Sequence, residues 1–134
     1  MTAIDIPDGV TRINEYTFYG AVVLNSITFG ANSQLKSIGS YAFMAAYELT
    51  AIAIPNTVTT IDYRGFYSAN VMTSITIPDS VTIGDQAFYF YNSASSSTTT
   101  TVYVLDVSPD VTFEEFQVTF NACTDRPITY VDST

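Results

Sequence analysis

The sequence predicts a repeat solenoid, mainly β with short helical or irregular turns, made of about four regular repeats and an irregular C-terminal capping coil. Three observations predict this fold. Similar segments recur at intervals of about 23 residues, each opens with alternating apolar and small residues, and each carries a phenylalanine at the same place. We expect repeats at residues 1–23, 24–48, 49–71 and 72–92, a Ser/Thr-rich loop at 93–101 and the capping coil at 102–134.

Each repeat begins with a half-buried strand. In residues 3–6 and 74–77, two branched apolar side chains alternate with small or polar ones, so the two kinds face opposite sides. Proline ends the strand in three repeats, because it fixes φ and cannot donate to a strand ladder. The residue after each proline suits a turn, since its side chain can accept hydrogen bonds from nearby backbone amides. These residues are Asp8, Asn56 and Asp79.

The second part of each repeat returns the chain along another side. A Val-x-x-Ile step, with leucine in place of valine in the second repeat and one residue fewer in the fourth, leads to a small residue and then to an inward phenylalanine. The resulting ladder consists of Phe18, Phe43, Phe66 and Phe88. One repeat buries about five or six apolar side chains worth roughly 1.5–3 kcal/mol each, whereas ordering costs about 1–2 kcal/mol per residue. No repeat is therefore expected to fold without its neighbours.

The combined pattern x-Ile-x-Ile-Pro-x-x-Val-x-x-Ile-x-x-x-Ala-Phe, over about residues 3–91, resembles the BspA-like, or Treponema pallidum-type, leucine-rich repeat family. The resemblance implies a right-handed coil of the leucine-rich-repeat type. It also implies a surface protein that binds host proteins or neighbouring cells. The second repeat departs from the pattern, because residues 30–34 replace the proline, and a longer turn is expected there.

The C-terminal third is predicted to close the stack. Strands are expected at 101–105 and 127–131. Between them, Thr112 and Glu115 fit a capping box, and Phe113, Phe116 and Phe120 fall on one face of the helix that follows. We expect this helix to seal the end of the phenylalanine ladder. The neighbouring acids at the helix start favour its positive end and are not a catalytic pair.

The N-terminal end has no such closure. The edge that carries Ile4, Ile6 and Phe18 is predicted to lie bare, and exposed strand edges invite pairing. We infer that another subunit or an upstream domain covers this end.

Charge and composition exclude several function classes. The formal net charge is −9, and the only cations are Arg12, Lys36, Arg64 and Arg126. Nucleic acid and anionic membranes are therefore disfavoured as partners. Histidine is absent, and Cys123 is the single cysteine and is expected to be a small buried residue, so no catalytic residues, metal site or cofactor are predicted. The first residues lack the basic flank and apolar run of a signal peptide, so we expect either that the protein is not exported by that route or that this chain is a segment of a longer one. No stretch is apolar and long enough for membrane insertion to be expected.

Two surfaces are candidates for binding. The first is the outward row of the repeat strands, small and nearly uncharged, formed by Asp5, Thr28, Ala53 and Thr76 with Ala3, Ser26, Ala51 and Ser74 beside them. Four or five strands give a face of only about 300 Å², against roughly 800 Å² per partner in a stable interface. This face alone is therefore too small for a stable interface, and a partner would also have to contact residues beside it.

The second surface is a tyrosine-rich rim around the ladder, in which Tyr19, Tyr67 and Tyr89 are the favoured contacts. The other members are Tyr16, Tyr41, Tyr47, Tyr63 and Tyr91. The alternative interpretation is that these rings only cover the ladder, with their hydroxyl groups in water.

The sequence therefore predicts a non-enzymatic protein-binding or adhesion module with an extracellular protein partner. It would be located at a cell surface, or secreted as part of a longer chain. The alternative is a structural subunit of a larger surface or virion assembly, a homo-oligomer that self-associates through the uncovered N-terminal edge.

Overall fold

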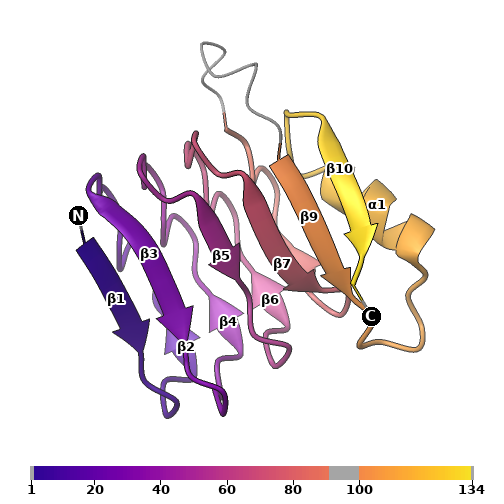
Figure 1. Ribbon diagram of the computed structural model, residues 1–134, viewed down its shortest axis with the longest axis horizontal. Coiled ribbons are helices and arrows are strands. Elements are labelled where there is room, and N and C mark those ends of the chain that lie inside the picture. Colours follow the sequence, from indigo (N-terminus) through magenta and orange to yellow (C-terminus); the bar gives the residue numbers. More distant parts are fainter. Residues whose placement is uncertain (1, 91–99, 134) are drawn as a thin grey trace.

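The computed structural model describes residues 2–90 and 100–133, which wind as a mainly β solenoid with one short helix. Successive coils follow one another along the long axis, from the N-terminus at one end to the helix at the other (Figure 1). The predicted fold class is confirmed. We call the four regular repeats coils 1 to 4.

The front of the solenoid is formed by parallel strands in two sheets. The first sheet pairs β1 (Thr2–Ile6) with β3 (Leu24–Phe29), and the second has the order β10-β9-β7-β5. The strands of the second sheet are β5 (Ala51–Ala53), β7 (Ser74–Pro78), β9 (Thr100–Leu105) and β10 (Ile128–Asp132). The two C-terminal strands thus lie within one residue of their expected bounds. Residues 93–99 of the expected loop lie outside the described residues, and its last two residues belong to β9.

The back of the solenoid contains a continuous four-stranded sheet of two-residue strands, in the order β2-β4-β6-β8. These are β2 (Arg12–Ile13), β4 (Ser37–Ile38), β6 (Thr60–Ile61) and β8 (Thr82–Ile83). The isoleucine of each Val-x-x-Ile step lies in this sheet, so the predicted return along a second side is confirmed.

The segment that carries each phenylalanine follows the back sheet. Its backbone amides donate to the carbonyl groups of the next coil, as from Phe18 to Ala42 (2.8 Å) and from Phe43 to Gly65 (2.7 Å). This pattern needs a left-handed residue two positions before each phenylalanine and, in coils 1 to 3, another two positions after it. Those residues are Tyr16, Tyr41, Arg64 and Gln86 before it, and Gly20, Ala45 and Ser68 after it.

The phenylalanine ladder runs through the core. The ring centroids of neighbouring rungs lie 5.1 Å (Phe18–Phe43), 4.9 Å (Phe43–Phe66) and 5.2 Å (Phe66–Phe88) apart, with interplanar angles of 13°, 5° and 6°. The last three rungs are fully buried. Each ring therefore stacks on the ring of the next coil, which is one contact through which the repeats are expected to stabilise one another.

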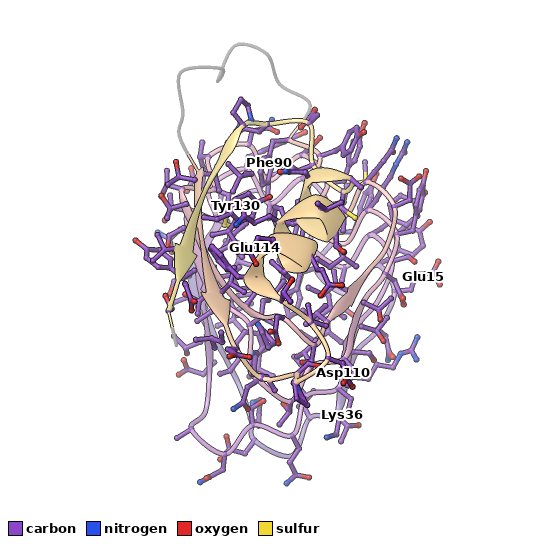
Figure 2. All side chains as sticks on the ribbon, turned by 90° about the vertical axis from the view of Figure 1, so that its right-hand side faces the viewer. Glu15, Lys36, Phe90, Asp110, Glu114 and Tyr130 are labelled. Carbon is purple, nitrogen blue, oxygen red and sulfur yellow. The ribbon has the colours of Figure 1, made fainter. Side chains whose placement is uncertain are left out.

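The C-terminal end is closed by α1 (Phe113–Asn121), which begins with the predicted capping box between Thr112 and Glu115. Phe120 lies 4.8 Å from Phe88, centroid to centroid, and becomes the fifth rung of the ladder. Figure 2 looks onto this end and shows α1 lying across it. The expectation that the helix seals the ladder is confirmed.

The turn after the strand corrects one expectation. The Asp79 carboxylate accepts hydrogen bonds from the amides of Val107 (3.0 Å) and Ser108 (2.8 Å), which belong to the next coil rather than to its own turn. Asp79 is buried, so its side chain ties two coils together. The Asp79 carboxylate is therefore a contact between repeats, whereas Oδ1 of Asp8, at the same position of coil 1, is buried without a hydrogen-bond partner in the described part of the chain.

Candidate functional site

The outward row predicted from the sequence lies on the front of the solenoid. Asp5 is opposite Thr28 across β1 and β3, and Ala53 is opposite Thr76 across β5 and β7. The Thr28 hydroxyl donates to the Asp5 carboxylate. No strand pairing joins β3 to β5 in the described residues, so the four positions form two pairs in two sheets rather than one continuous row.

The surface at the border of the two sheets is slightly concave. A shallow, open depression of about 440 Å³ lies over β3 and β5, and an adjoining one of about 310 Å³ continues it past the ends of these strands. The two share Ala53 and Thr76, and we call them together the β5 groove. Its lining consists of Asn25, Ser26, Ile27, Phe29, Gly30, Ala31, Ser33, Thr50, Ala51, Ile52, Ala53, Ile54, Pro55, Asn56, Ser74, Thr76 and Leu105.

Two features of the sequence produce this groove. The outward residues of β5 are Ala51 and Ala53, whose small side chains leave the floor low. The longer turn of coil 2, at residues 30–34, forms one wall. The residue that follows the turn, Leu35, is joined to coil 3, because its carbonyl accepts a hydrogen bond from the Thr57 hydroxyl (2.6 Å).

The groove differs in charge from the rest of the molecule. None of its lining residues is ionisable, although the chain carries a formal net charge of −9. One end offers mainly hydroxyl groups, from Ser26, Thr50 and Ser74, and the other end is more apolar, with Phe29 and Leu105. The groove thus suits a ligand that is uncharged where it is buried.

The tyrosine rim lies elsewhere. Figure 2 places Glu15, the neighbour of Tyr16, on the side of the solenoid opposite β10. Tyr16 stacks on Tyr41 with centroids 5.0 Å apart, and Tyr19 meets the edge of Tyr16 at 5.6 Å. The predicted tyrosines therefore do not join the front residues in one site.

Among the three favoured tyrosines, the exposure differs. Tyr19 is 53% exposed, whereas most of the surface of Tyr67 and Tyr89 is buried. The Arg64 guanidinium lies 4.5 Å above the Tyr67 ring and 4.9 Å above the Tyr63 ring. Its Nε donates to Gln86 (2.6 Å), which ties coil 3 to coil 4. Arg64 thus joins tyrosines of the rim to one another and to coil 4. Tyr91 lies outside the described residues.

A second hollow, of about 130 Å³, lies beside α1 and includes Asp79, Asp106 and Asp132 in its lining. Asp79 is engaged with backbone amides of the next coil. Among the described residues, no group of three or more Asp, Glu, Cys or His side chains is arranged to hold a metal ion. In the same part of the chain, no helix is long and apolar enough to cross a membrane.

Sequence reasoning assigned Ala53, Thr76 and Thr28 to the candidate binding face but missed the groove that Ala53 and Thr76 line. The signals were present: two alanines on one strand and an insertion in the preceding repeat. Neither of them shows that β3 and β5 fail to pair, because pairing depends on how two neighbouring coils pack.

Known proteins resemble this chain along almost its whole length. The profile of the BspA type leucine rich repeat region matches residues 1–113, in six copies. A leucine-rich repeat protein from Bacteroides ovatus superposes with a TM-score of 0.67 at 23% identity, covering 96% of this chain and 30% of that one. A leucine rich cell surface protein from Faecalibacterium prausnitzii superposes with a TM-score of 0.63 at 29% identity, covering 100% of this chain and 28% of that one. This chain thus spans less than a third of either structure, and no curated protein matches it significantly.

Proposed function

Because the chain belongs to the BspA-type leucine-rich repeat family, we propose that it is a non-enzymatic protein-binding module that works at a cell surface. The family supports the general role of protein interaction. The surface location rests on the similar Faecalibacterium prausnitzii structure, which is described as a cell surface protein. Adhesion to a host protein or a neighbouring cell is the specific form of binding that we propose.

The observation that carries this proposal is the β5 groove. It is a depression on the strand face, it contains the predicted residues Ala53 and Thr76, and it is uncharged on an acidic molecule. A recessed, neutral surface can be dehydrated at lower cost than the charged surface around it. Thr28 and Asp5 lie on the adjoining sheet and provide a polar rim.

Binding to purified extracellular-matrix proteins, measured by surface plasmon resonance, tests this function. We expect at least one of them to bind, and Ala53→Arg to weaken that binding at least tenfold because the new side chain fills the groove. Thr119→Arg, on the exposed side of α1, is the matched control and is expected to leave binding unchanged. Absence of binding, or equal binding by both variants, would refute the proposal.

The open end of coil 1 favours a second candidate, a structural subunit that self-associates. β1 pairs with β3 on one side only, and Phe18 lies half-buried at the end of the ladder. Such an edge can pair with the edge of a second copy.

Light scattering across a range of concentrations tests self-association. An oligomer that dissociates in Ala3→Pro, in which the edge of β1 is blocked, would support this candidate. A monomer at all concentrations would exclude it.

A further inference from the structure

We propose that a strip of tyrosines on the rim binds the arginine side chains of a basic segment of the partner protein. This inference rests on the proposed protein-binding function and adds a second contact surface to it, with the chemistry of the segment that this surface would hold. It follows from the contacts among the rings, from their exposure, from a cation that the chain itself places over two of them, and from a carboxylate beside them.

The rings form one connected surface over coils 1 to 3. Tyr16 stacks on Tyr41 with centroids 5.0 Å apart, and Tyr19 meets the edge of Tyr16 at 5.6 Å. Tyr41 in turn meets Tyr63 at 5.6 Å, with an interplanar angle of 84°. Rings in such contacts restrain one another, so a ligand meets a surface that is already formed. We call the following five residues the tyrosine strip: Tyr16, Tyr19, Tyr41, Tyr63 and Tyr67.

The tyrosine strip is open to a partner. The exposed fractions of Tyr16, Tyr19 and Tyr63 are 51%, 53% and 37%. Tyr63 lies in coil 3, which has a coil on each side, so its exposure follows from the outward direction of its side chain and not from its place in the stack. Tyrosine is enriched at protein interfaces because it offers a large amphipathic contact area. The strip therefore has the composition and the exposure of a contact surface.

A cation of the chain shows how a guanidinium group fits these rings. The Arg64 guanidinium lies 4.5 Å above the Tyr67 ring and 4.9 Å above the Tyr63 ring. Its Nε donates to Gln86 at 2.6 Å, which fixes its position. A guanidinium is planar and weakly hydrated, so it stacks on an aromatic face and is attracted by the charge distribution of the ring. The C-terminal part of the strip is thus occupied by a cation of the chain itself.

The N-terminal part of the strip offers rings without such a cation. Two residues before the ladder phenylalanine, coil 1 has Tyr16 where coil 3 has Arg64. One residue after it, coil 1 has Tyr19 where coil 3 has Tyr67. Among the described residues, neither tyrosine of coil 1 has an arginine or lysine over its ring. A guanidinium group from the partner can occupy this part of the strip as Arg64 occupies the other.

A carboxylate borders the same part of the strip. The Tyr16 amide donates to the Ser40 carbonyl (3.1 Å), and the Tyr41 amide donates to the Tyr63 carbonyl (3.2 Å). Glu15, Ser40 and Tyr63 therefore occupy one repeat position in neighbouring coils, with the short serine between the carboxylate and the ring. Glu15 is exposed and can accept hydrogen bonds from a guanidinium that lies over the tyrosines. The formal net charge of −9 attracts basic segments to the whole molecule, and Glu15 with the rings selects where they bind.

Fluorescence polarisation of a labelled glycine–serine peptide that carries two arginines, titrated with the full chain, tests this inference. We expect binding, and a loss of about tenfold when both arginines are replaced by citrulline, which keeps the planar shape but has no charge. In NMR spectra, the ring signals of Tyr16 and Tyr19 should shift on addition of the arginine peptide. No binding, or equal affinity for the two peptides, would overturn the inference.

Matched variants separate the strip from the general acidity of the chain. Tyr19→Leu keeps an apolar side chain but removes the ring, so it should weaken binding about threefold or more, whereas Tyr19→Phe should not. Tyr103→Leu, at a 36% exposed tyrosine of β9, is the control and should have no effect. Glu15→Gln should weaken binding much more than Glu114→Gln, which removes the same charge at an exposed position of α1. Equal effects of a variant and its control would contradict the role of the strip.

The same measurements distinguish this inference from the proposed function. If a matrix protein binds and Ala53→Arg weakens that binding, but the arginine peptide does not bind, only the inference about the strip fails. If no matrix protein binds, the proposed function fails, and the affinities of the two peptides still decide whether the strip holds arginine.

Discussion

The two ends of the phenylalanine ladder are built differently. At the N-terminal end, Phe18 stacks on Phe43 on one side and is only half-buried, since no further coil covers its other side in the structure. At the C-terminal end, Phe88 is fully buried beneath Phe120, and Tyr130 meets the edge of Phe120 at 6.0 Å. The ladder thus leaves part of the Phe18 ring exposed at one end and buries the Phe88 ring at the other.

At the C-terminal end, α1 takes the place of a regular coil but keeps two of its contacts, the backbone hydrogen bond from the phenylalanine amide and the ring stacking. The Phe88 amide donates to the Cys123 carbonyl at 3.0 Å, as the Phe66 amide donates to Ala87 at 2.8 Å. Cys123 thus stands where earlier coils have a small residue, and it is buried as the sequence predicted. The fifth ring, Phe120, comes from α1 rather than from another regular repeat. A solenoid can therefore end by substituting one aromatic side chain from a helix.

The largest expected effect compares the two ends directly. Phe120→Ala should lower the free energy of unfolding by about 3–5 kcal/mol, the usual cost of emptying a buried phenylalanine site. Phe18→Ala should cost less than half as much, because part of that ring already faces solvent. Urea denaturation of both variants measures the difference. Equal losses would show that the N-terminal ring is as well covered in solution as the C-terminal one.

A smaller effect is expected at Arg126, which fastens the closed end to coil 3. Its Nη2 donates to the Asn70 carbonyl (3.0 Å), and the guanidinium lies 4.5 Å above the Phe90 ring. Arg126→Ala should cost about 2 kcal/mol, in the range for hydrogen bonds to charged groups. Arg12→Ala, an exposed cation of the open end, is the control and should change stability by less than about 0.5 kcal/mol. Similar losses in thermal unfolding of the two variants would argue against this role.

The capping box of α1 should contribute less again. Thr112→Ala should cost about 1 kcal/mol, whereas Thr119→Ala in the same helix should be nearly neutral.

The Thr112 amide donates to Glu115 Oε1 at 2.9 Å and holds the pKa of Glu115 below its usual range. A lowered carboxyl pKa stabilises the fold above the ordinary pKa and loses that stabilisation as pH falls. Glu115→Gln should therefore be less stable than the unchanged chain near neutral pH, and the difference between them, measured by urea denaturation, should shrink as pH falls. A difference that is the same at neutral and acid pH would contradict the capping role.

The smallest effect is expected at alkaline pH. Burial, with a smaller contribution from Cys123, raises the pKa of Tyr130 to about 12 from 10.0. Because the folded chain holds this proton more tightly than the unfolded chain, the stabilisation is present below pH 10 and lost as pH rises towards 12. Tyr130→Phe should reduce the alkaline loss of stability, as measured by urea denaturation at pH 9 and pH 11, but it also removes the hydrogen bond to Asn121 (2.6 Å). A steeper alkaline loss in the variant would rule out this account.

Much of the fold could be read from local patterns. The strand alternation, the prolines and the recurring phenylalanine each occupy positions fixed within one repeat, and the capping box needs only residues 112–115. Such patterns identify strands and helix starts because the physics that favours them acts over a few residues. The stacking of Phe18, Phe43, Phe66 and Phe88 then follows from the period alone.

The candidate site was only partly predictable. Ala53 and Thr76 could be assigned to the outward face by alternation, but Asp5 and Thr28 lie in a separate sheet. The contact of Asp79 with the next coil and the anchoring of Arg126 also join residues distant in sequence. No local rule specifies these pairs.

The sequence by itself therefore determined the period, the coil and its closed C-terminal end, because these depend on side-chain patterns within each repeat. Only the tertiary structure decided that β3 and β5 separate and leave the β5 groove. The physical reason is that pairing between two strands depends on the spacing of whole coils. Between coils 2 and 3, the front strands β3 and β5 do not pair, whereas the back strands β4 and β6 do. The insertion at residues 30–34 and the small side chains of β5 lie on the unpaired side.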